Sequence, residues 1–215
     1  MSTLKSPRSY SSATRDDAAE KTRARIVAAA TKRLLSKKGA AGFSLEAVAR
    51  AAGVTRLTVY NQFGARRALL EAVFDDIARR GGLFRIGEAL SDPDPEKGLC
   101  RLIAIFCAFW SAHDHAIGRL MAAGAIDAEF AESMRARNER RRRALGLLVG
   151  RIVGEAKKKT PEIRDLVDTL FALTSHAFFT ELRSGGRTAE GASTIIEQLA
   201  RDALRRATEP ARARN

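Results

Sequence analysis

The chain has 215 residues, 45% of them apolar, and carries 38 lysines and arginines against 25 aspartates and glutamates. This length and composition fit one or two small domains with a true core, which excludes disordered, collagen-like and mucin-like proteins. Residues 1–80 hold 16 basic and 7 acidic side chains, whereas residues 81–215 hold 22 and 18. We therefore expect the basic, partner-binding end of the molecule to be its N-terminal part.

Four amphipathic helices are predicted in the first 80 residues, because apolar residues recur there at helical spacing and glycines interrupt the pattern. The predicted helices are the stripe from Ile26 to Leu35, followed by residues 45–52, 56–63 and 66–80. Ser44 and Thr55 are suited to cap the second and third of these helices, and Gly53 and Gly64 to end them.

The second half of the chain also shows helical spacing throughout, so we expect an all-α protein. The helices predicted there are residues 96–113, 116–125, 128–158, 161–184 and 189–207. Residues 161–184 are apolar around most of the helix circumference, which predicts cover from their own core and from another subunit. Residues 189–207 are the expected neighbour of that helix.

No apolar run is long enough for a membrane span. The longest, residues 102–110, has nine residues, against the roughly 18 that a bilayer requires. Residues 1–15 are polar and lack the apolar centre of a secretory signal, so we expect a flexible tail in a cytoplasmic protein. Cys100 and Cys107 lie about 10 Å apart on one predicted helix, beyond disulfide reach, and we expect both to be reduced core residues.

The helices at 45–52 and 56–63 have the residue types that a helix-turn-helix requires. Ala49 is small where the helices cross, and Gly53 supplies the positive φ of the turn. The positions left facing outward are Thr55, Arg56, Leu57, Thr58, Tyr60 and Asn61. Such a helix fits the major groove of DNA. An ordinary helical hairpin in a bundle is the alternative, which the concentrated positive charge disfavours.

The run from Phe43 to Leu70 resembles the DNA-binding domain of the tetracycline-repressor (TetR-like) family of bacterial transcriptional regulators. Tyr60 and Phe63 stand where the family has its Tyr-x-x-Phe pair. Gly64 occupies the position of the usual Pro or Gly, and Arg66 takes the place of the usual Lys at the start of the fourth helix. The resemblance extends over about residues 22–77.

The resemblance implies an all-helical homodimeric repressor that a small-molecule effector releases from a palindromic operator, with no cofactor. It implies three parts: a flexible basic tail (1–20), an N-terminal three-helix DNA-binding domain with a helix-turn-helix (21–80), and a C-terminal helical ligand-binding and dimerisation domain (81–215). Leu57 departs from the family pattern, where glycine is common, and this affects only the details of base contact.

Side-chain chemistry assigns roles on DNA. Arg56 and Thr58 are expected to read base edges, since arginine forks onto guanine and threonine offers a methyl and a hydroxyl. The residues expected on phosphates are Ser44, Tyr60, Asn61 and Arg66. A solvated role for Arg56 and Arg66 is the alternative. Further basic residues near the N-terminus either add contacts to DNA or belong to a plain disordered tail: Lys5, Arg8, Arg15, Lys21 and Arg23.

Aromatic residues gather in the C-terminal half and suit either a packed core or an apolar ligand cavity. The residues predicted to line a cavity are Phe106, Phe109, Trp110, His113, Met121, Phe171 and His176. Core packing is the safer expectation for any single one of the aromatic residues. We expect no metal site from the histidines and Asp114, because consecutive helical residues do not share a face.

Six arginines between residues 135 and 143 cover too much of their helix to form one stripe, so a solvated face is expected; contact with an acidic ligand or partner is the alternative.

The sequence has no phosphate-binding loop, H-E-x-x-H or paired C-x-x-C motif, and no nucleophile with a matched base, so we expect no enzyme. An architectural DNA-binding protein without a ligand is disfavoured by the large apolar C-terminal half.

Overall fold

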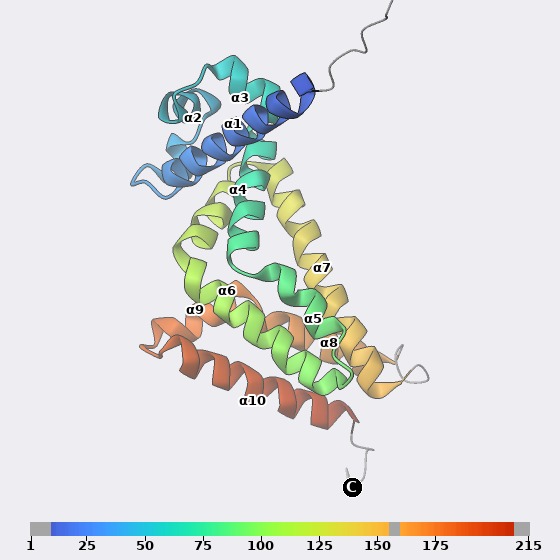
Figure 1. Ribbon diagram of the computed structural model, residues 1–215. Helices are drawn as coiled ribbons and strands as arrows, with labels where there is room; N and C mark the ends of the chain where they lie inside the picture. The colour runs from blue at the N-terminus through green and yellow to red at the C-terminus, as the bar shows by residue number, and fades with distance from the viewer. Residues whose placement is uncertain (1–9, 155–159, 209–215) are drawn as a thin grey trace, which may run out of the picture. The chain divides into compact units, whose positions relative to one another are not determined.

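The computed structural model describes residues 10–154 and 160–208, and every regular element among them is helical (Figure 1). The elements are α1 (Tyr10–Leu34), η1 (Gly39–Gly42), α2 (Leu45–Ala52), α3 (Arg56–Phe63), α4 (Arg66–Arg80), η2 (Leu83–Arg85), α5 (Ile86–Leu90), α6 (Pro95–Gly124), α7 (Ala128–Val153), α8 (Pro161–Leu173), α9 (His176–Ser184) and α10 (Ala189–Thr208). The predicted all-α class is confirmed. Among the described helices, none has both the length and the apolar character that a membrane crossing needs.

The chain divides into two compact units, and the boundary falls between Val73 and Phe74, inside α4. The boundary expected from the sequence was the end of this helix at Arg80. The boundary was expected there because glycines often end helices, and Gly81 and Gly82 follow Arg80.

The first unit is built around α1, which packs on α2, while α2 packs on α3. The apolar stripe predicted on α1 is the core face, since Ile26, Ala30 and Leu34 are fully buried. The following helices add further buried side chains to this unit: Val48, Ala49, Val59, Phe63, Leu69 and Leu70.

Helix α1 begins at Tyr10, so the part of the expected tail from residue 10 to residue 20 is helical. This stretch has good helix formers such as Ala18 and Ala19, and opposite charges four residues apart at Asp17 and Lys21. The stretch has no apolar stripe, and the sequence prediction of helices depended on such a stripe. Residues 1–9 of the expected tail lie outside the described residues.

In the second unit, α6 is the central helix and packs against α5, α7, α9 and α10, while α8 packs against α7 and α10. Helix α6 is continuous where two helices were predicted, with one non-helical residue, His113, at φ −128° and ψ 16°. The kink lies at the predicted break, but the chain resumes its helix at once instead of forming a loop. The short elements η2 and α5 were not predicted.

The helix predicted over residues 161–184 is interrupted, and α8 and α9 meet at Thr174 and Ser175. Ser175 caps α9, its hydroxyl accepting a hydrogen bond from the amide of Phe178 at 3.1 Å. A single helix is therefore the wrong prediction here. Helix α7 ends at Val153, and residues 155–158 of its predicted range lie outside the described residues.

Both cysteines are free thiols. Cys107 is buried as expected, whereas Cys100 is only half-buried. Burial raises the pKa of each thiol above its ordinary value, which lowers the fraction of reactive thiolate at neutral pH.

Candidate functional site

Helices α2 and α3 are joined by a turn that Gly53 makes possible. Gly53 has φ 64° and ψ 39°, a left-handed conformation that costs other residues free energy. The amide of Val54 donates to the carbonyl oxygen of Ala49 at 3.1 Å and closes the turn. Ser44 caps α2 by accepting from the amide of Ala47 at 3.1 Å, and Thr55 caps α3 by accepting from the amide of Thr58 at 3.1 Å. The two helices thus have fixed beginnings and a fixed connection.

One side of α3 is anchored and the other is open. Val59 and Phe63 are buried beneath the helix. The residues predicted to face outward are exposed, with the exception of Thr58, which is half-buried: Thr55, Arg56, Leu57, Tyr60 and Asn61. Leu57 is 66% exposed and Tyr60 is 56% exposed, so this face offers an apolar and an aromatic side chain beside its polar ones.

Two arginines brace this unit around α3. The Nε of Arg66, in the first turn of α4, donates to the carbonyl oxygen of Phe43 at 3.2 Å, and its guanidinium lies 5.6 Å from the centre of the Phe43 ring. From α1, Arg23 Nη1 donates to the carbonyl oxygen of Gln62 at 3.0 Å and its guanidinium stacks 4.3 Å over Phe63. The bracing role of Arg23 spans 39 residues and has no local sequence signal.

A short capped helix with an exposed polar and cationic face, joined to a preceding helix through a left-handed glycine, has the architecture of a helix-turn-helix. In proteins that bind DNA, the second helix of this motif lies in the major groove.

Residues 27–73 match the family model described as bacterial regulatory proteins, tetR family. Two solved structures share the fold. A TetR-like transcriptional regulator from Rhodococcus sp. RHA1 is 21% identical with a TM-score of 0.60, over 93% of this chain and 98% of that chain. A protein assigned to the TetR family of transcriptional regulators from Mesorhizobium loti is 17% identical with a TM-score of 0.53, over 88% and 96%. A comparison with curated proteins gives no match.

The resemblance read from the sequence is confirmed over residues 27–73, which match the family model. The chain as a whole shares its fold with two solved structures that are described as TetR-like or TetR-family transcriptional regulators.

The second unit contains a pocket of about 460 Å³ between α4, α5, α6 and α7. Three of the predicted ligand-binding residues line it, namely Phe106, Trp110 and Met121. The other apolar residues of its wall are Phe74, Ala78, Leu83, Ile86, Leu90, Met134, Ala144 and Leu147. Its volume lies in the range of small-molecule sites.

The remaining four predicted ligand residues lie elsewhere. Phe109 is fully buried and packs against Trp110 and His113, with ring centroids 4.9 and 5.4 Å away. Phe171 lies under two guanidinium groups of α7, and His176 Nε2 lies 2.7 Å from Asp114 Oδ1. None of the four lines the pocket: Phe109 and His113 are on α6, Phe171 is on α8 and His176 is on α9.

The three histidines have different surroundings. His176 pairs with Asp114, and His115 Nε2 accepts from Arg119 Nε at 3.3 Å. His113 contacts Phe109, and burial, reinforced by the positive charge of Arg80, holds its pKa below the ordinary value. Within the residues that the structure describes, no cluster of three metal-ligating side chains forms.

The arginine run on α7 is a solvated face only in part, because Arg135, Arg140 and Arg143 are exposed whereas Arg137 and Arg141 are not. Arg141 is only 7% exposed, and its Nη1 donates to the carbonyl oxygen of Phe171 at 3.1 Å and to Thr174 Oγ1 at 3.0 Å. Arg137 is half-buried and pairs with Asp75 at 2.8 Å. Consecutive residues of a helix point in different directions, so one run of arginines contacts several surfaces.

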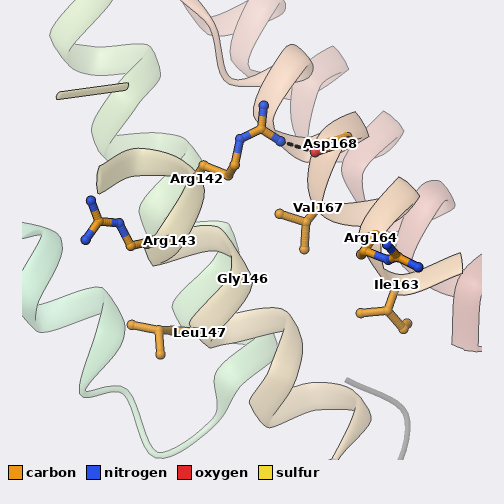
Figure 2. Close-up of a pocket in the computed structure, with 8 residues that line it drawn as sticks. All are labelled: Arg142, Arg143, Gly146, Leu147, Ile163, Arg164, Val167 and Asp168. Carbon is orange, nitrogen blue, oxygen red and sulfur yellow. Dashed lines mark hydrogen bonds and ion pairs between the residues drawn. The ribbon is translucent and has the colours of Figure 1, made fainter. Parts of the chain in front are cut away.

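A second hollow, of about 550 Å³, lies between α7 and α8 (Figure 2). Arg142 reaches across it to an ion pair with Asp168 on α8, whereas Arg143 and Leu147 point to the other side of α7. Arg143 and Leu147 line both hollows, so α7 is the wall between them.

Proposed function

We propose that the protein represses transcription by binding a palindromic DNA duplex as a homodimer, with α3 of each subunit in one of two successive major grooves. The observation that carries this proposal is the open face of α3, where Arg56, Leu57, Tyr60 and Asn61 are exposed above a buried anchor. Half-sites one helical turn apart, about 34 Å, fit a two-fold dimer of such readers. The proposal places the protein in the cytoplasm, where it meets DNA.

The proposed division of roles follows the geometry. Arg56 and Thr58 lie at the start of α3, which is the end of a reading helix that reaches base edges. Thr58 Oγ1 lies 2.9 Å from Thr55 Oγ1, so its hydroxyl is oriented by the cap and its methyl is available to a thymine. Ser44, Tyr60, Asn61 and Arg66 are proposed to contact phosphates, which position the protein without reading sequence.

The proposed dimer uses α8, α9 and α10 packed against their symmetry mates. The buried apolar residues of α8 and α9 are Ile163, Leu166, Leu170, Leu173 and Phe179, which pack within their own unit, so support for this face comes chiefly from α10. Leu199 is 38% exposed there, Ile195 is half-buried, and Phe178 on α9 is also half-buried. An apolar surface of this kind suits a symmetric helical interface.

The proposed effector is a small molecule in the pocket lined by Phe106, Trp110 and Met121. It would release DNA by binding more tightly to a conformation whose reading helices are wrongly spaced for successive grooves. A tenfold loss of DNA affinity requires a coupling free energy of only about 1.4 kcal/mol.

The experiment that tests the proposal is to map the DNA fragments bound by the purified protein across its own genome and then to measure affinity for the site found. Affinity for the palindrome is expected to exceed that for a scrambled duplex of equal length, and to fall steeply with salt as lysines and arginines displace counterions. Equal affinity for the palindrome and the scrambled duplex would overturn the proposal.

A further inference from the structure

The pocket between α4, α5, α6 and α7 is apolar on most of its wall and cationic on one side. Its charged residues are four arginines of α7 and one aspartate of α4: Arg137, Arg140, Arg141, Arg143 and Asp75. Asp75 is already paired with Arg137 at 2.8 Å. The other three positive charges have no carboxylate on the pocket wall to balance them.

Arg141 is the most unusual of these side chains, because it is buried and charged without a countercharge. No ion pair within the described part of the chain involves it, and its polar partners are neutral, namely the Phe171 carbonyl and the Thr174 hydroxyl. Its Nε is buried without a hydrogen-bond partner. Burial lowers the pKa of its guanidinium to about 10, so the group stays protonated at neutral pH.

A buried guanidinium without a counterion carries a large desolvation cost, which a bound anion would offset. Arginine is also the side chain whose planar fork fits a carboxylate. Arg140 and Arg143, both exposed, lie on the same helix beside it and add to the positive potential of the pocket. Phe106, Trp110 and Met134 supply the apolar surface that an uncharged hydrocarbon body would cover.

We propose that the effector is an amphipathic organic acid, whose carboxylate pairs with Arg141 and its neighbours Arg140 and Arg143 while its apolar body packs on Phe106 and Trp110. This inference rests on the proposed function, since it names the chemical class of the ligand in the proposed effector pocket. It also gives the arginine run on α7 a role, because consecutive arginines serve the pocket, the α8–α9 junction and the ion pair with Asp168.

The test compares acids with their neutral amides of nearly equal shape: decanoate with decanamide, and phenylacetate with phenylacetamide. Binding to the full-length dimer is followed by calorimetry and by the fluorescence of Trp110, the only tryptophan of the chain. At least one acid is expected to bind about tenfold or more tightly than its amide, and to lose that advantage at high salt. Equal binding of acid and amide in both pairs would overturn the inference and leave the pocket as a site for neutral ligands.

Variants assign the preference to α7. Arg141→Gln keeps a donor toward the Phe171 carbonyl but removes the charge, and it is expected to reduce acid affinity to that of the amide without changing amide affinity. Arg142→Gln is the matched control on the neighbouring residue, which pairs with Asp168 and does not line this pocket, and it is expected to leave the preference intact. An acid preference that survives Arg141→Gln would overturn the assignment.

If Arg141→Gln fails to fold, as judged by circular dichroism, the double variant Arg140→Gln/Arg143→Gln carries the test, because both side chains are exposed. It is expected to weaken acid binding severalfold and amide binding not at all, and an unchanged acid affinity would count against the inference. Absence of any probe binding to a protein that still binds its DNA site would also overturn it. Loss of specific DNA binding by the wild type is a separate result, which refutes the proposed function.

Discussion

The indole nitrogen of Trp110 donates a hydrogen bond of 3.0 Å to the carbonyl oxygen of Thr174, and both groups are buried. Thr174 lies in the interruption between α8 and α9, where a helix would otherwise satisfy this carbonyl. Trp110 also lines the pocket and packs edge-on against His176, with ring centroids 5.4 Å apart. The same side chain therefore borders the proposed effector and holds the helix break together.

Replacing Trp110 by Phe is expected to lower the free energy of unfolding by about 1–3 kcal/mol, because the Thr174 carbonyl is left buried without its donor. Urea denaturation followed by circular dichroism measures this, since the variant has no tryptophan to report by fluorescence. A midpoint equal to that of the wild type would show that the hydrogen bond contributes nothing to stability.

Replacing Arg56 by Ala is expected to cost about 1–3 kcal/mol of binding free energy on the cognate DNA site and to relax sequence preference at one position. Replacing Arg66 by Ala is expected to weaken binding to every sequence alike, because it removes a positive charge that is proposed to contact phosphate. The control is Lys32→Ala, an equal loss of charge at an exposed position of α1. Affinities for the cognate site and single-base variants at one salt concentration decide between these roles, and uniform weakening by Arg56→Ala would contradict a base-reading role.

Replacing Gly53 by Ala is expected to destabilise the first unit by about 1–2 kcal/mol, because the turn requires φ 64°. No atom lies within 4 Å of the added methyl, so the cost is backbone strain and not a clash. The control is Gly118→Ala, at a helical glycine that also has open space, where we expect a gain of about 0.5–1 kcal/mol. Thermal unfolding of both variants gives the comparison, and equal shifts of the two midpoints would contradict the strain argument.

Replacing Leu199 by Glu is expected to convert the proposed dimer to monomers, because a carboxylate would be buried in an apolar interface. Gln198→Glu introduces the same charge at the neighbouring exposed residue and serves as the control. Sedimentation at micromolar concentration distinguishes the species. A dimeric Leu199→Glu protein would move the interface away from this face of α10.

The folded protein is expected to lose stability as the pH falls below about 6.5, the ordinary pKa of histidine. Burial holds the pKa of His113 below that value, so at lower pH the unfolded chain binds more protons than the folded chain at this site. The loss continues until the pH reaches the lowered pKa of the folded state. Melting temperatures between about pH 7.5 and 5 are expected to fall less in His113→Gln than in the wild type, and parallel curves would exclude His113 as a contributor.

The helix-turn-helix could be predicted to the residue, and the observed bounds of α2 and α3 are those expected. The reason is that its signals are local: Ser44, Gly53, Thr55 and Gly64 each act within four residues of their own position. The break between α8 and α9 has one local signal, the cap at Ser175, but the donor to the Thr174 carbonyl, Trp110, is 64 residues distant.

The pocket could be predicted only in part. Aromatic spacing indicated helices with apolar faces, but it does not tell which face of α6 meets a cavity and which meets the core, so Phe106 and Phe109 were indistinguishable. For the arginines of α7 the sequence predicted exposure, but Arg141 is buried. Arginine is mostly exposed in proteins, and the two hydrogen-bond partners of the buried Arg141, the Phe171 carbonyl and the Thr174 hydroxyl, are 30 and 33 residues distant.

The guanidinium of Arg141 has a fixed number of N–H donors. A ligand in the pocket and the groups at the end of α8 therefore compete for the same donors. Its Nη1 holds Phe171 and Thr174, which form the end of α8, while the same residue borders the pocket. An anion that draws the guanidinium toward itself must lengthen those two bonds or share their donors. Occupancy of the pocket and amide protection around the α8–α9 junction are then thermodynamically linked quantities, and hydrogen exchange at Thr174 and Ser175 would report the arrival of a ligand that never touches them.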